Sequence, residues 1–301
     1  MTDRMTGKTT AGNSTVAIVG AGSLATSLAV ALDRGGFTIT EIVARDSPQS
    51  RRRARRLAAK VGAREVTADA AALDSELLWL CVPDREIRSA ASVLANRLAV
   101  RAPVHKKRKV LFAFHSSGAL GSRELEPLRQ AGVAVASVHP LMTFVAGTHP
   151  SLQGVPFAVE GDDAATRVAR RIVRRLGGES FALPARRKAA YHAWATLTSP
   201  LLVAFLVTLE EAASAAGLSR QDARRKSLPI ITETLANYSR LGPARSFSGP
   251  LVRGDAETVA KHLAVLKKHP GAREVYVALA RAALRGLPVK NRIELTRLLR
   301  N

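Results

Sequence analysis

Apolar and polar positions alternate along the first part of the chain with two different periods. The segment TVAIVGAGSLATSLAVAL, from Thr15 to Leu32, shows both: a short apolar run reaches Gly20, small residues follow, and apolar residues resume at helical spacing. Short runs rich in β-branched residues are typical of strands, and recurrence at i, i+3 and i+4 is typical of helices. The predicted strands are Val16–Val19, Thr38–Ala44, Leu77–Val82, Val110–Phe114, Val133–Val138, Val155–Val159 and Ser180–Ala182. The predicted helices between them include Ser23–Arg34, Pro48–Val61 and Asp162–Leu176.

Strands and helices that alternate in this way predict an α/β fold, in which right-handed crossovers build a mostly parallel, doubly wound sheet of the Rossmann type. After Pro184 the pattern changes, and helical periodicity continues to the end of the chain with breaks at residues such as Gly217 and Pro270. We therefore predict three parts: a flexible N-terminal tail at residues 1–13, a nucleotide-binding α/β domain at 14–183, and an all-helical domain at 184–301.

The first predicted turn carries a dinucleotide-binding motif. The sequence GAGSLA, which begins at Gly20, matches G-x-G-x-x-[G/A] between a strand and a helix, where phosphate binding requires it. The first glycine permits the tight turn, the second lets the backbone approach a diphosphate, and Ala25 lets the helix pack on the strand. The helix then offers free N–H groups and a positive dipole end; the alternative is a structural turn without a ligand. The predicted coenzyme contacts here are Gly20, Ala21, Gly22, Ser23, Leu24 and Ala25.

The end of the second predicted strand favours NADP(H) over NAD(H). NAD-binding domains of this type usually carry an acidic residue about 20 residues past the glycines, where it binds the ribose hydroxyls. In this chain the strand ends with Ala44 and Arg45, and Ser47 and Arg51 follow. A guanidinium and a hydroxyl suit a 2′-phosphate, so we expect Arg45 and Ser47 to bind it with help from Arg51. Two alternatives stay open: Asp46 could reach a ribose hydroxyl, and the arginines could only cover an exposed helix.

Ligands of such sheets bind outside the carboxyl ends of the strands, so the loops that follow the strands carry further candidates. After the strand LLWLCV we expect Val82 and Pro83 to form a wall of the coenzyme site and Asp84 to cap the next helix. Cys81 is interpreted as a small strand residue, because nothing in the sequence supplies it with a nearby base.

Two histidine-containing loops follow neighbouring predicted strands. The loop HSSG places Ser116, Ser117 and Gly118 where the nicotinamide should lie, and their hydroxyls and backbone N–H groups suit a substrate carboxylate or carbonyl. Ser117 and Gly118 are therefore also expected to contact the coenzyme. After the strand VAVASV, His139 comes to the neighbouring strand end. A lone histidine is more often structural, but two at adjacent strand ends leave a structural and a functional role equally open.

The first helix of the predicted helical domain carries the last candidates. Lys188 and His192 are four residues apart, and Tyr191 is three from Lys188, so the three side chains can share a face. Polar groups in so apolar a segment need partners when buried, and either a substrate or hydrogen bonds within the core would supply them. His192 is our first choice for a general acid, since histidine titrates near neutral pH.

Composition narrows the class of protein. Hydrophobic residues make up 47% of the 301 positions, which indicates a globular chain with a substantial core. The formal net charge is +22, with a local basic cluster HKKRKV, yet aromatic residues are only 4% and the arginines recur within amphipathic helices. We therefore expect solvated helix faces and consider nucleic acid an unlikely partner.

The remaining sequence features concern metal, compartment and membrane. One cysteine excludes internal disulfides and cysteine-based metal clusters, and we expect no metal site. The N-terminal sequence MTDRMTGKTTAGNS lacks the apolar core of a signal peptide. The uncharged run Ala189–Leu209 is almost long enough to span a bilayer, but it contains His192 and Pro200 and favours a buried helix. We expect a cytoplasmic protein that does not enter a membrane.

Several segments together resemble a known family. GAGSLATSLAVAL, HSSGALGSRELEPLRQAGVAVASVHPLMTF, AAYHAWATLTSPLLVAFL, LANY and SGPLVRGDAETVAKHL are similar, in this order, to bacterial proteins that join a Rossmann-like domain to the domain of unknown function 2520 (DUF2520). This family resembles pyrroline-5-carboxylate reductase and other enzymes with a 6-phosphogluconate-dehydrogenase-like C-terminal domain. The resemblance implies an N-terminal NADP-binding domain and a C-terminal helical domain that usually dimerises. It also implies site roles for residues already named: Gly20, Gly22, Ala25, Ser116, Ser117, Gly118, His139, Tyr191 and His192, with Lys188 as a further match.

Together these inferences predict an NADP-dependent oxidoreductase. The expected reaction is NADPH-dependent reduction of a small, anionic C=O or C=N compound, for which a 2-oxo acid is one candidate. His192, or a water that it orients, would supply the proton, and Ser116 and Ser117 would position the substrate. The alternative is a non-catalytic NADP(H)-binding sensor or scaffold. Either protein is expected to form a homodimer through its helical domain.

Overall fold

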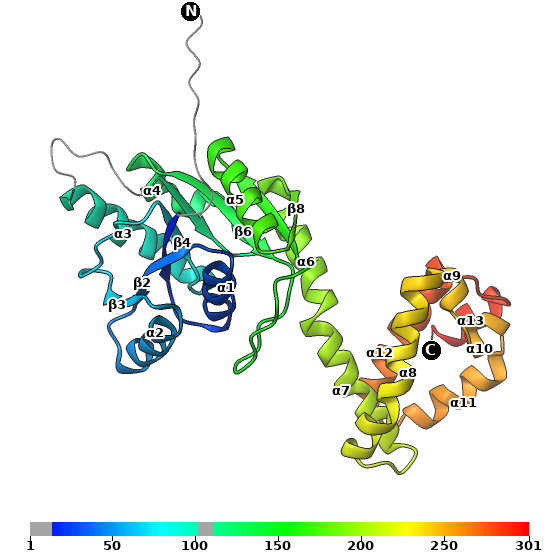
Figure 1. Cartoon of the computed structure of the whole chain (residues 1–301). Helices are drawn as coiled ribbons and strands as arrows, with labels where there is room; N and C mark the ends of the chain where they lie inside the picture. The colour runs from blue at the N-terminus through cyan, green and yellow to red at the C-terminus, as the bar shows by residue number, and fades with distance from the viewer. Residues whose placement is uncertain (1–13, 102–110, 301) are drawn as a thin grey trace, which may run out of the picture. The chain divides into compact units, whose positions relative to one another are not determined.

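A computed structural model describes residues 14–101 and 111–300 of the chain. The chain divides into two compact units, Met1–Ala195 and Thr196–Asn301, each of which is described by itself (Figure 1). The tail predicted at residues 1–13, the basic cluster HKKRKV and the first residue of the strand predicted at Val110–Phe114 lie outside the described residues.

The described part of the first unit contains one sheet of eight strands in the order β3-β2-β1-β4-β5-β6-β7-β8. The strands are β1 (Thr15–Val19), β2 (Thr38–Ala44), β3 (Arg64–Thr67), β4 (Leu77–Leu80), β5 (Phe112–His115), β6 (Ala134–Pro140), β7 (Pro156–Gly161) and β8 (Glu179–Ala182). Neighbouring strands are parallel except β6 and β7, which are antiparallel. The order reverses direction at β1, which confirms the predicted Rossmann-type, mostly parallel sheet.

Helices cover both faces of this sheet (Figure 1). They are α1 (Ser23–Arg34), α2 (Pro48–Val61), α3 (Ile87–Arg101), α4 (Glu126–Gln130) and α5 (Asp163–Arg175), with short 3-10 helices η1 (Asp84–Glu86), η2 (Ser122–Leu125) and η3 (Ala185–Arg187). Side chains of a strand alternate between faces, so Ile18 packs in the core with α1, α2 and α5, while Ala17 packs in the core with α3 and α4. Both cores bury their strands from two sides, which explains the continuous apolar runs in the sequence.

Several strand predictions differ from the structure in their bounds. The strand predicted at Leu77–Val82 ends at Leu80, and the one predicted at Val110–Phe114 is observed at Phe112–His115. The strand Arg64–Thr67, with the sequence REVT, was not predicted. It pairs only with β2 at the edge of the sheet, and such a short, charged segment lacks the apolar run of an interior strand.

The second unit is helical. Helix α6 (Lys188–Thr198) begins in the first unit, and the helices that follow are α7 (Pro200–Ser214), α8 (Arg220–Leu241), α9 (Pro243–Ser246), α10 (Pro250–Arg253), α11 (Ala256–Leu266), α12 (Pro270–Gly286) and α13 (Arg292–Leu298). Val259, Leu263 and Leu295 belong to its buried core. The first unit extends past the predicted boundary at Leu183, because Lys188 and Tyr191 at the start of α6 are buried in it.

The segment Ala185–Ser214 is long and apolar enough to cross a membrane by length and composition alone. The backbone interrupts it, because α6 ends at Thr198 and α7 begins at Pro200. Lys188 at its start is only 2% exposed and hydrogen-bonds to the sheet side of the first unit. The buried helix expected at Ala189–Leu209 is not observed, because the side chains of α6 and α7 are mostly exposed, apart from residues such as Tyr191 and Glu210.

Candidate functional site

The turn between β1 and α1 leaves a helix N-terminus open. Gly20 has φ +105°, and a Cβ there would overlap the carbonyl oxygen of Cys81, so only glycine fits. Gly22 has ordinary φ −80°, and a Cβ on it would meet no atom within 4 Å. No side chain caps α1 at this N-cap residue. Its first N–H groups and positive dipole end therefore face free space, as an anion site requires.

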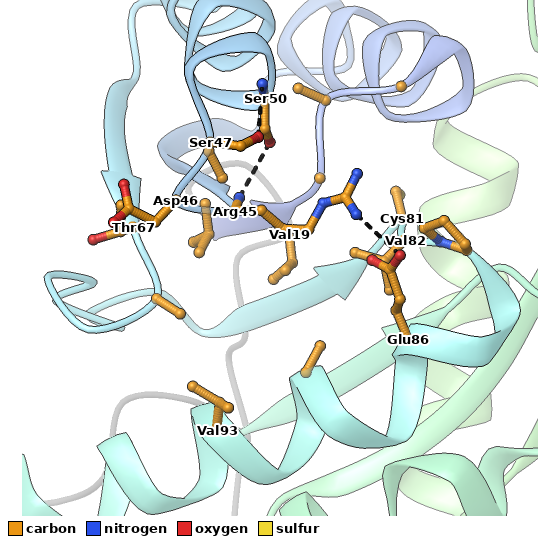
Figure 2. A pocket seen from close by; sticks show the side chains of 18 of the residues that line it. Val19, Arg45, Asp46, Ser47, Ser50, Thr67, Cys81, Val82, Glu86 and Val93 are labelled. Atoms are coloured by element: carbon orange, nitrogen blue, oxygen red, sulfur yellow. Dashed lines mark hydrogen bonds and ion pairs between the residues drawn. The ribbon is translucent and has the colours of Figure 1, made fainter.

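A cavity of about 520 Å³ extends from this turn along the carboxyl ends of the strands (Figure 2). Side chains from α3, among them Val93 and Leu94, form an apolar wall, and polar residues follow β2. The predicted coenzyme residues that line it are Gly20, Ala21, Gly22, Arg45, Ser47, Val82 and Pro83. A concave, mostly apolar site with a few polar groups is what a nucleotide needs.

The other residues of the glycine motif have different surroundings. Ser23 lies with Gly22 on a neighbouring cavity of about 400 Å³, whose basic residues include Arg53 and Lys60. Ala25 is fully buried in the core beneath α1, where it permits close packing of the helix on the sheet. Leu24 is half-buried and lines neither cavity. The structure therefore gives Ala25 a packing role.

A cation just after β2 and its counter-ion on η1 both line the cavity. The Arg45 guanidinium donates to Glu86 Oε1 at 3.0 Å and remains 67% exposed (Figure 2). The Ser47 hydroxyl accepts from the Ser50 N–H and caps α2, so its own proton is left to donate. Arg53, which the sequence did not single out, lines the same cavity.

Arg51 does not join Arg45 at the cavity. Its Nε donates to Glu65 Oε1 at 2.9 Å, and this hydrogen bond raises the pKa of the Arg51 guanidinium. Arg51 also lies 3.7 Å from the Asp46 carboxylate. The structure thus pairs Arg51 with an acidic residue of β3, the strand that the sequence pattern missed, and Arg51 is not among the residues that line this cavity.

The loop after β5 is held by its own hydrogen bonds. The Ser117 hydroxyl donates to Asp84 Oδ2 at 2.7 Å and accepts from the N–H groups of Ala119 and Leu120. Ser117 is only 4% exposed, so its hydroxyl is not available to a substrate, contrary to the prediction. Asp84 is the first residue of η1 and makes no cap there; its carboxylate holds the Ser117 loop instead.

Ser116 differs from its neighbour. Its Oγ accepts a hydrogen bond of 2.9 Å from the indole Nε1 of Trp79, which is fully buried in the sheet. Ser116 itself is half-buried, and its hydroxyl proton has no acceptor among the described residues. Of the two predicted serines, Ser116 is the one that keeps a donor for a ligand.

His115 anchors the same loop from below. Its Nδ1 accepts from the Ser117 N–H at 3.1 Å, so the proton must be on Nε2, which donates to the Gly121 carbonyl at 3.0 Å. Burial lowers the pKa of His115 to about 4, against a smaller raising effect of the Gly121 hydrogen bond. His115 is therefore neutral and structural.

Lys188 approaches the loop from α6. Its Nζ donates to the Ser117 carbonyl at 2.9 Å and to Ser137 Oγ at 2.5 Å, and the residue is 2% exposed. Burial lowers the pKa of Lys188 to about 8, although Glu160 and Asp84 nearby raise it. The structure thus assigns the predicted catalytic lysine to a buried position behind the loop, with backbone and serine partners.

His139 and His192 come together at Gly118, and Tyr191 contacts His139. His139 Nδ1 lies 2.8 Å from the Tyr191 hydroxyl, and the His139 and His192 rings are 6.5 Å apart. A Cβ on Gly118 would lie 2.8 Å from His139 Nε2 and 2.7 Å from His192 Cδ2. Glycine is therefore required for both imidazoles to approach the loop.

The protonation of this group follows from burial. Burial first, and the Lys188 ammonium second, lower the pKa of His139 to about 4. Burial also raises the pKa of the Tyr191 hydroxyl to about 12. Near neutral pH His139 is thus a neutral imidazole and Tyr191 a neutral phenol. His192 is exposed, and its ring makes no hydrogen bond within residues 14–101 and 111–300.

Cys81 and Ser137 complete the comparison with the sequence. Burial raises the pKa of the Cys81 thiol to about 12, which agrees with its interpretation as an unreactive residue, but β4 ends one residue before it, at Leu80. Ser137 and Glu86 contact predicted site residues and were missed, because nothing local in the sequence links either residue to a partner on a distant element.

Comparisons with known proteins confirm the predicted resemblance. Residues 3–140 match the Rossmann-like domain, and residues 155–283 match the domain of unknown function DUF2520. No curated protein matches the chain.

Solved structures share the fold. A candidate NADP oxidoreductase from Bacteroides fragilis is 22% identical, with a TM-score of 0.70 over 90% of this chain and 97% of that chain. A pyrroline-5-carboxylate reductase from Coxiella burnetii is 15% identical (TM-score 0.56; 89% and 98% covered). An imine reductase from a Pseudomonas species is 19% identical (TM-score 0.56; 95% and 99% covered). At these identities the similarity establishes the fold.

Proposed function

We propose that this chain, a Rossmann-like domain followed by a DUF2520 domain, is an NADPH-dependent reductase of small anionic C=O or C=N compounds. The observation that carries the proposal is the uncapped N-terminus of α1, which opens at Gly22 into free space beside a cavity of about 520 Å³. Backbone N–H groups and the helix dipole there suit a diphosphate. The neighbours in fold include proteins named as an NADP oxidoreductase, a pyrroline-5-carboxylate reductase and an imine reductase, and they support a reductase.

The preference for NADPH rests on the charges at the end of β2. Arg45, Arg53 and the Ser47 hydroxyl line the cavity at the place where a 2′-phosphate is expected. A phosphate would compete with Glu86 for Arg45, and a dianion binds a guanidinium more strongly than one carboxylate does. Asp46 also lines the cavity and would favour a ribose hydroxyl, so the preference is expected to be finite.

The chemistry would take place near Gly118. When bound, the coenzyme supplies a hydride to the carbon of the C=O or C=N bond. The chain must then deliver a proton to the oxygen or nitrogen. His192 is exposed beside Gly118 with both ring nitrogens available, whereas half-buried His139 is neutral and bound to Tyr191. We therefore assign proton delivery to His192, directly or through a water, and positioning to His139 and Tyr191.

Kinetics test this assignment. Single-turnover oxidation of bound NADPH is measured with a panel of 2-oxo acids and cyclic imines. The His192→Ala variant should be slower by about 100-fold, in the range usual for a lost acid catalyst, whereas the matched His262→Ala variant in the second unit should be unchanged. Normal hydride transfer in both His192→Ala and His139→Ala would exclude proton delivery by His192 and positioning by His139. Tight NADPH binding without oxidation by any compound of the panel would instead indicate a sensor or scaffold.

A second copy of the chain is the partner that we propose for the helical unit. Helices α7 and α8 expose large apolar side chains, each at least 38% accessible, which is unusual for an isolated soluble domain. They are Leu201, Leu202, Val203, Val207, Leu228, Ile230, Leu235 and Tyr238. Sedimentation should give a dimer that Ile230→Glu disrupts and that Ile293→Glu, an exposed position on α13, leaves intact; a monomeric wild type would overturn this.

We place this reductase in the cytoplasm, where NADPH is available.

A further inference from the structure

Between Ser117 and Leu120, in the loop after β5, one backbone N–H group has no partner while the other three do. The N–H of Ser117 donates to His115 Nδ1, and those of Ala119 and Leu120 donate to Ser117 Oγ. The N–H of Gly118 makes no hydrogen bond to any described residue, although Gly118 is buried. Buried backbone donors are nearly always paired, so a free one at this position indicates a place for a ligand acceptor.

The peptide that carries this N–H is bound by a cation on its other side. Lys188 Nζ donates to the Ser117 carbonyl at 2.9 Å, and Ser137 Oγ donates to the same oxygen at 3.3 Å. No peptide bond in the described chain is cis, so the Gly118 N–H points away from the Ser117 oxygen and from Lys188. A cation on the carbonyl withdraws electrons from the amide, and hydrogen bonds in such a chain strengthen one another.

Two imidazoles lie close to Gly118. His139 Nε2 and His192 Cδ2 are the groups nearest to the position that a Cβ would take on this glycine. No carboxylate belongs to this contact set, whereas Asp84 is bound to the Ser117 hydroxyl and Glu160 to Ser122. Both of these carboxylates thus have other partners, and a free N–H donor suits a negatively charged oxygen.

We propose that Lys188 is a positioning residue, whose ammonium polarises the Ser117–Gly118 peptide so that the Gly118 N–H binds a carboxylate oxygen of the substrate. This inference rests on the proposed function and makes it more specific, because it assigns the anionic group of the substrate to one backbone donor. Lys188 itself, buried behind the loop, does not touch the substrate. Its effect depends on its charge, which acts through one peptide bond.

The amide signal of Gly118 tests the proposal without any turnover. Glycine labelled with ¹⁵N and serine labelled with ¹³C at the carbonyl, combined by cell-free synthesis, select only glycines that follow serine, which are Gly118 and Gly249. Gly249 lies in the second unit and serves as the internal control. Oxalate, a carboxylate without a reducible bond, is the probe, and it is titrated with and without NADP+.

In the wild type, oxalate should shift the Gly118 signal and leave Gly249 unchanged. Lys188→Met should weaken this binding by roughly 10-fold, as expected when a charge-assisted hydrogen bond becomes a neutral one. Lys188→Arg, which keeps the charge, should restore at least part of the affinity. An oxalate-insensitive Gly118 signal, or equal affinity in wild type and Lys188→Met, would overturn the proposal.

A pH titration of the wild type gives a second readout that needs no variant. The Gly118 shift should change as Lys188 loses its proton near its pKa of about 8. The charged and titratable groups that face Lys188 are Asp84 on η1, Glu160 on β7, His115 on β5 and His139 on β6. The pKa values of the two histidines are lowered to about 4, so their steps are separate. A Gly118 shift that is constant between pH 7 and 9 would contradict the proposal.

Failure of the proposed function would give a different result. If the protein did not bind NADP(H), the oxalate and pH experiments without coenzyme could still succeed, since they concern only the loop, Lys188 and a carboxylate. If the protein reduced 2-oxo acids with NADPH while the Gly118 signal ignored oxalate, the reductase would stand and the role of Lys188 would fall.

Discussion

The substitution Gly22→Ala separates coenzyme binding from folding. Gly22 has φ −80° and ψ −175°, which any residue can adopt, and an added Cβ would meet no atom within 4 Å. Alanine caps a helix less well than glycine but loses less entropy on folding, and each effect is about 0.5–1 kcal/mol with opposite sign. The free energy of unfolding should therefore change by less than about 1 kcal/mol.

The affinity for NADPH should fall much further. The methyl group would occupy the space in front of the first N–H groups of α1, where a diphosphate oxygen has to approach. Loss of one to two hydrogen bonds to a charged group, at about 1.5–3 kcal/mol each, gives about 3 kcal/mol in total. Since every 1.4 kcal/mol is tenfold, the dissociation constant should rise by about 100-fold.

Gly62→Ala is the matched control. Gly62 ends α2 with φ +66°, and a Cβ there also meets nothing within 4 Å. Alanine in this left-handed conformation should cost about 1 kcal/mol of stability and leave NADPH binding unchanged. Urea unfolding measures the first quantity and fluorescence titration with NADPH the second. A dissociation constant of Gly22→Ala within threefold of the wild type would refute a diphosphate site at this turn.

Three further expectations follow from the described contacts. Gly20→Ala, at φ +105° and against a backbone carbonyl, should lower the free energy of unfolding by at least about 2 kcal/mol in urea, unlike Gly22→Ala. Arg45→Ala should weaken NADPH binding by about 10-fold and NADH binding hardly at all, while Glu86→Gln should strengthen NADPH binding; equal losses for both coenzymes would contradict the 2′-phosphate assignment. The pKa values of His115 and His139 are lowered from 6.5 to about 4, so the unfolded chain binds more protons between these values. As the pH is lowered from 6.5 to 4, each of these histidines should lower the free energy of unfolding by about 1.4 kcal/mol per pH unit. His139→Gln should remove the contribution of one histidine from this slope; an unchanged slope would contradict burial of the neutral imidazole.

The local pattern of the sequence is sufficient for the first crossover. A β-branched run, two glycines and an alanine-rich helix lie within Thr15 to Leu32, and the observed β1 and α1 begin and end within a residue or two of their predictions. Two contacts of the turn are distant in sequence: the carbonyl of Cys81 excludes a side chain at Gly20, and the carbonyl of Val43 accepts from the Gly20 N–H. Local signals of this kind predict the structure correctly because propensity, turn chemistry and packing all favour the same structure.

The roles of the loop residues depend on contacts that are distant in sequence. Ser117 was expected to bind a ligand with its hydroxyl, yet Asp84, from a different crossover, binds that hydroxyl. Lys188 has the helical spacing of a site residue, but its partners, Ser117 and Ser137, lie on two other loops and strands. Spacing along one helix identifies which side chains share a face and gives no information about what that face contacts. The sequence therefore predicts which residues lie near this loop better than it predicts the role of each residue.

The burial of Lys188 is itself an argument for a function of its charge. Its pKa is lowered to about 8 from 10.5, so the unfolded chain binds more protons between these two values, and stability rises with pH across that interval. At neutral pH the buried ammonium therefore destabilises the fold by about 3 kcal/mol relative to its hydrated state. Two neutral oxygens would be satisfied equally well by a neutral donor without this cost. A buried charge that destabilises the fold and lies behind a free backbone N–H is explained if the charge has a function, and polarisation of the Ser117–Gly118 peptide is such a function.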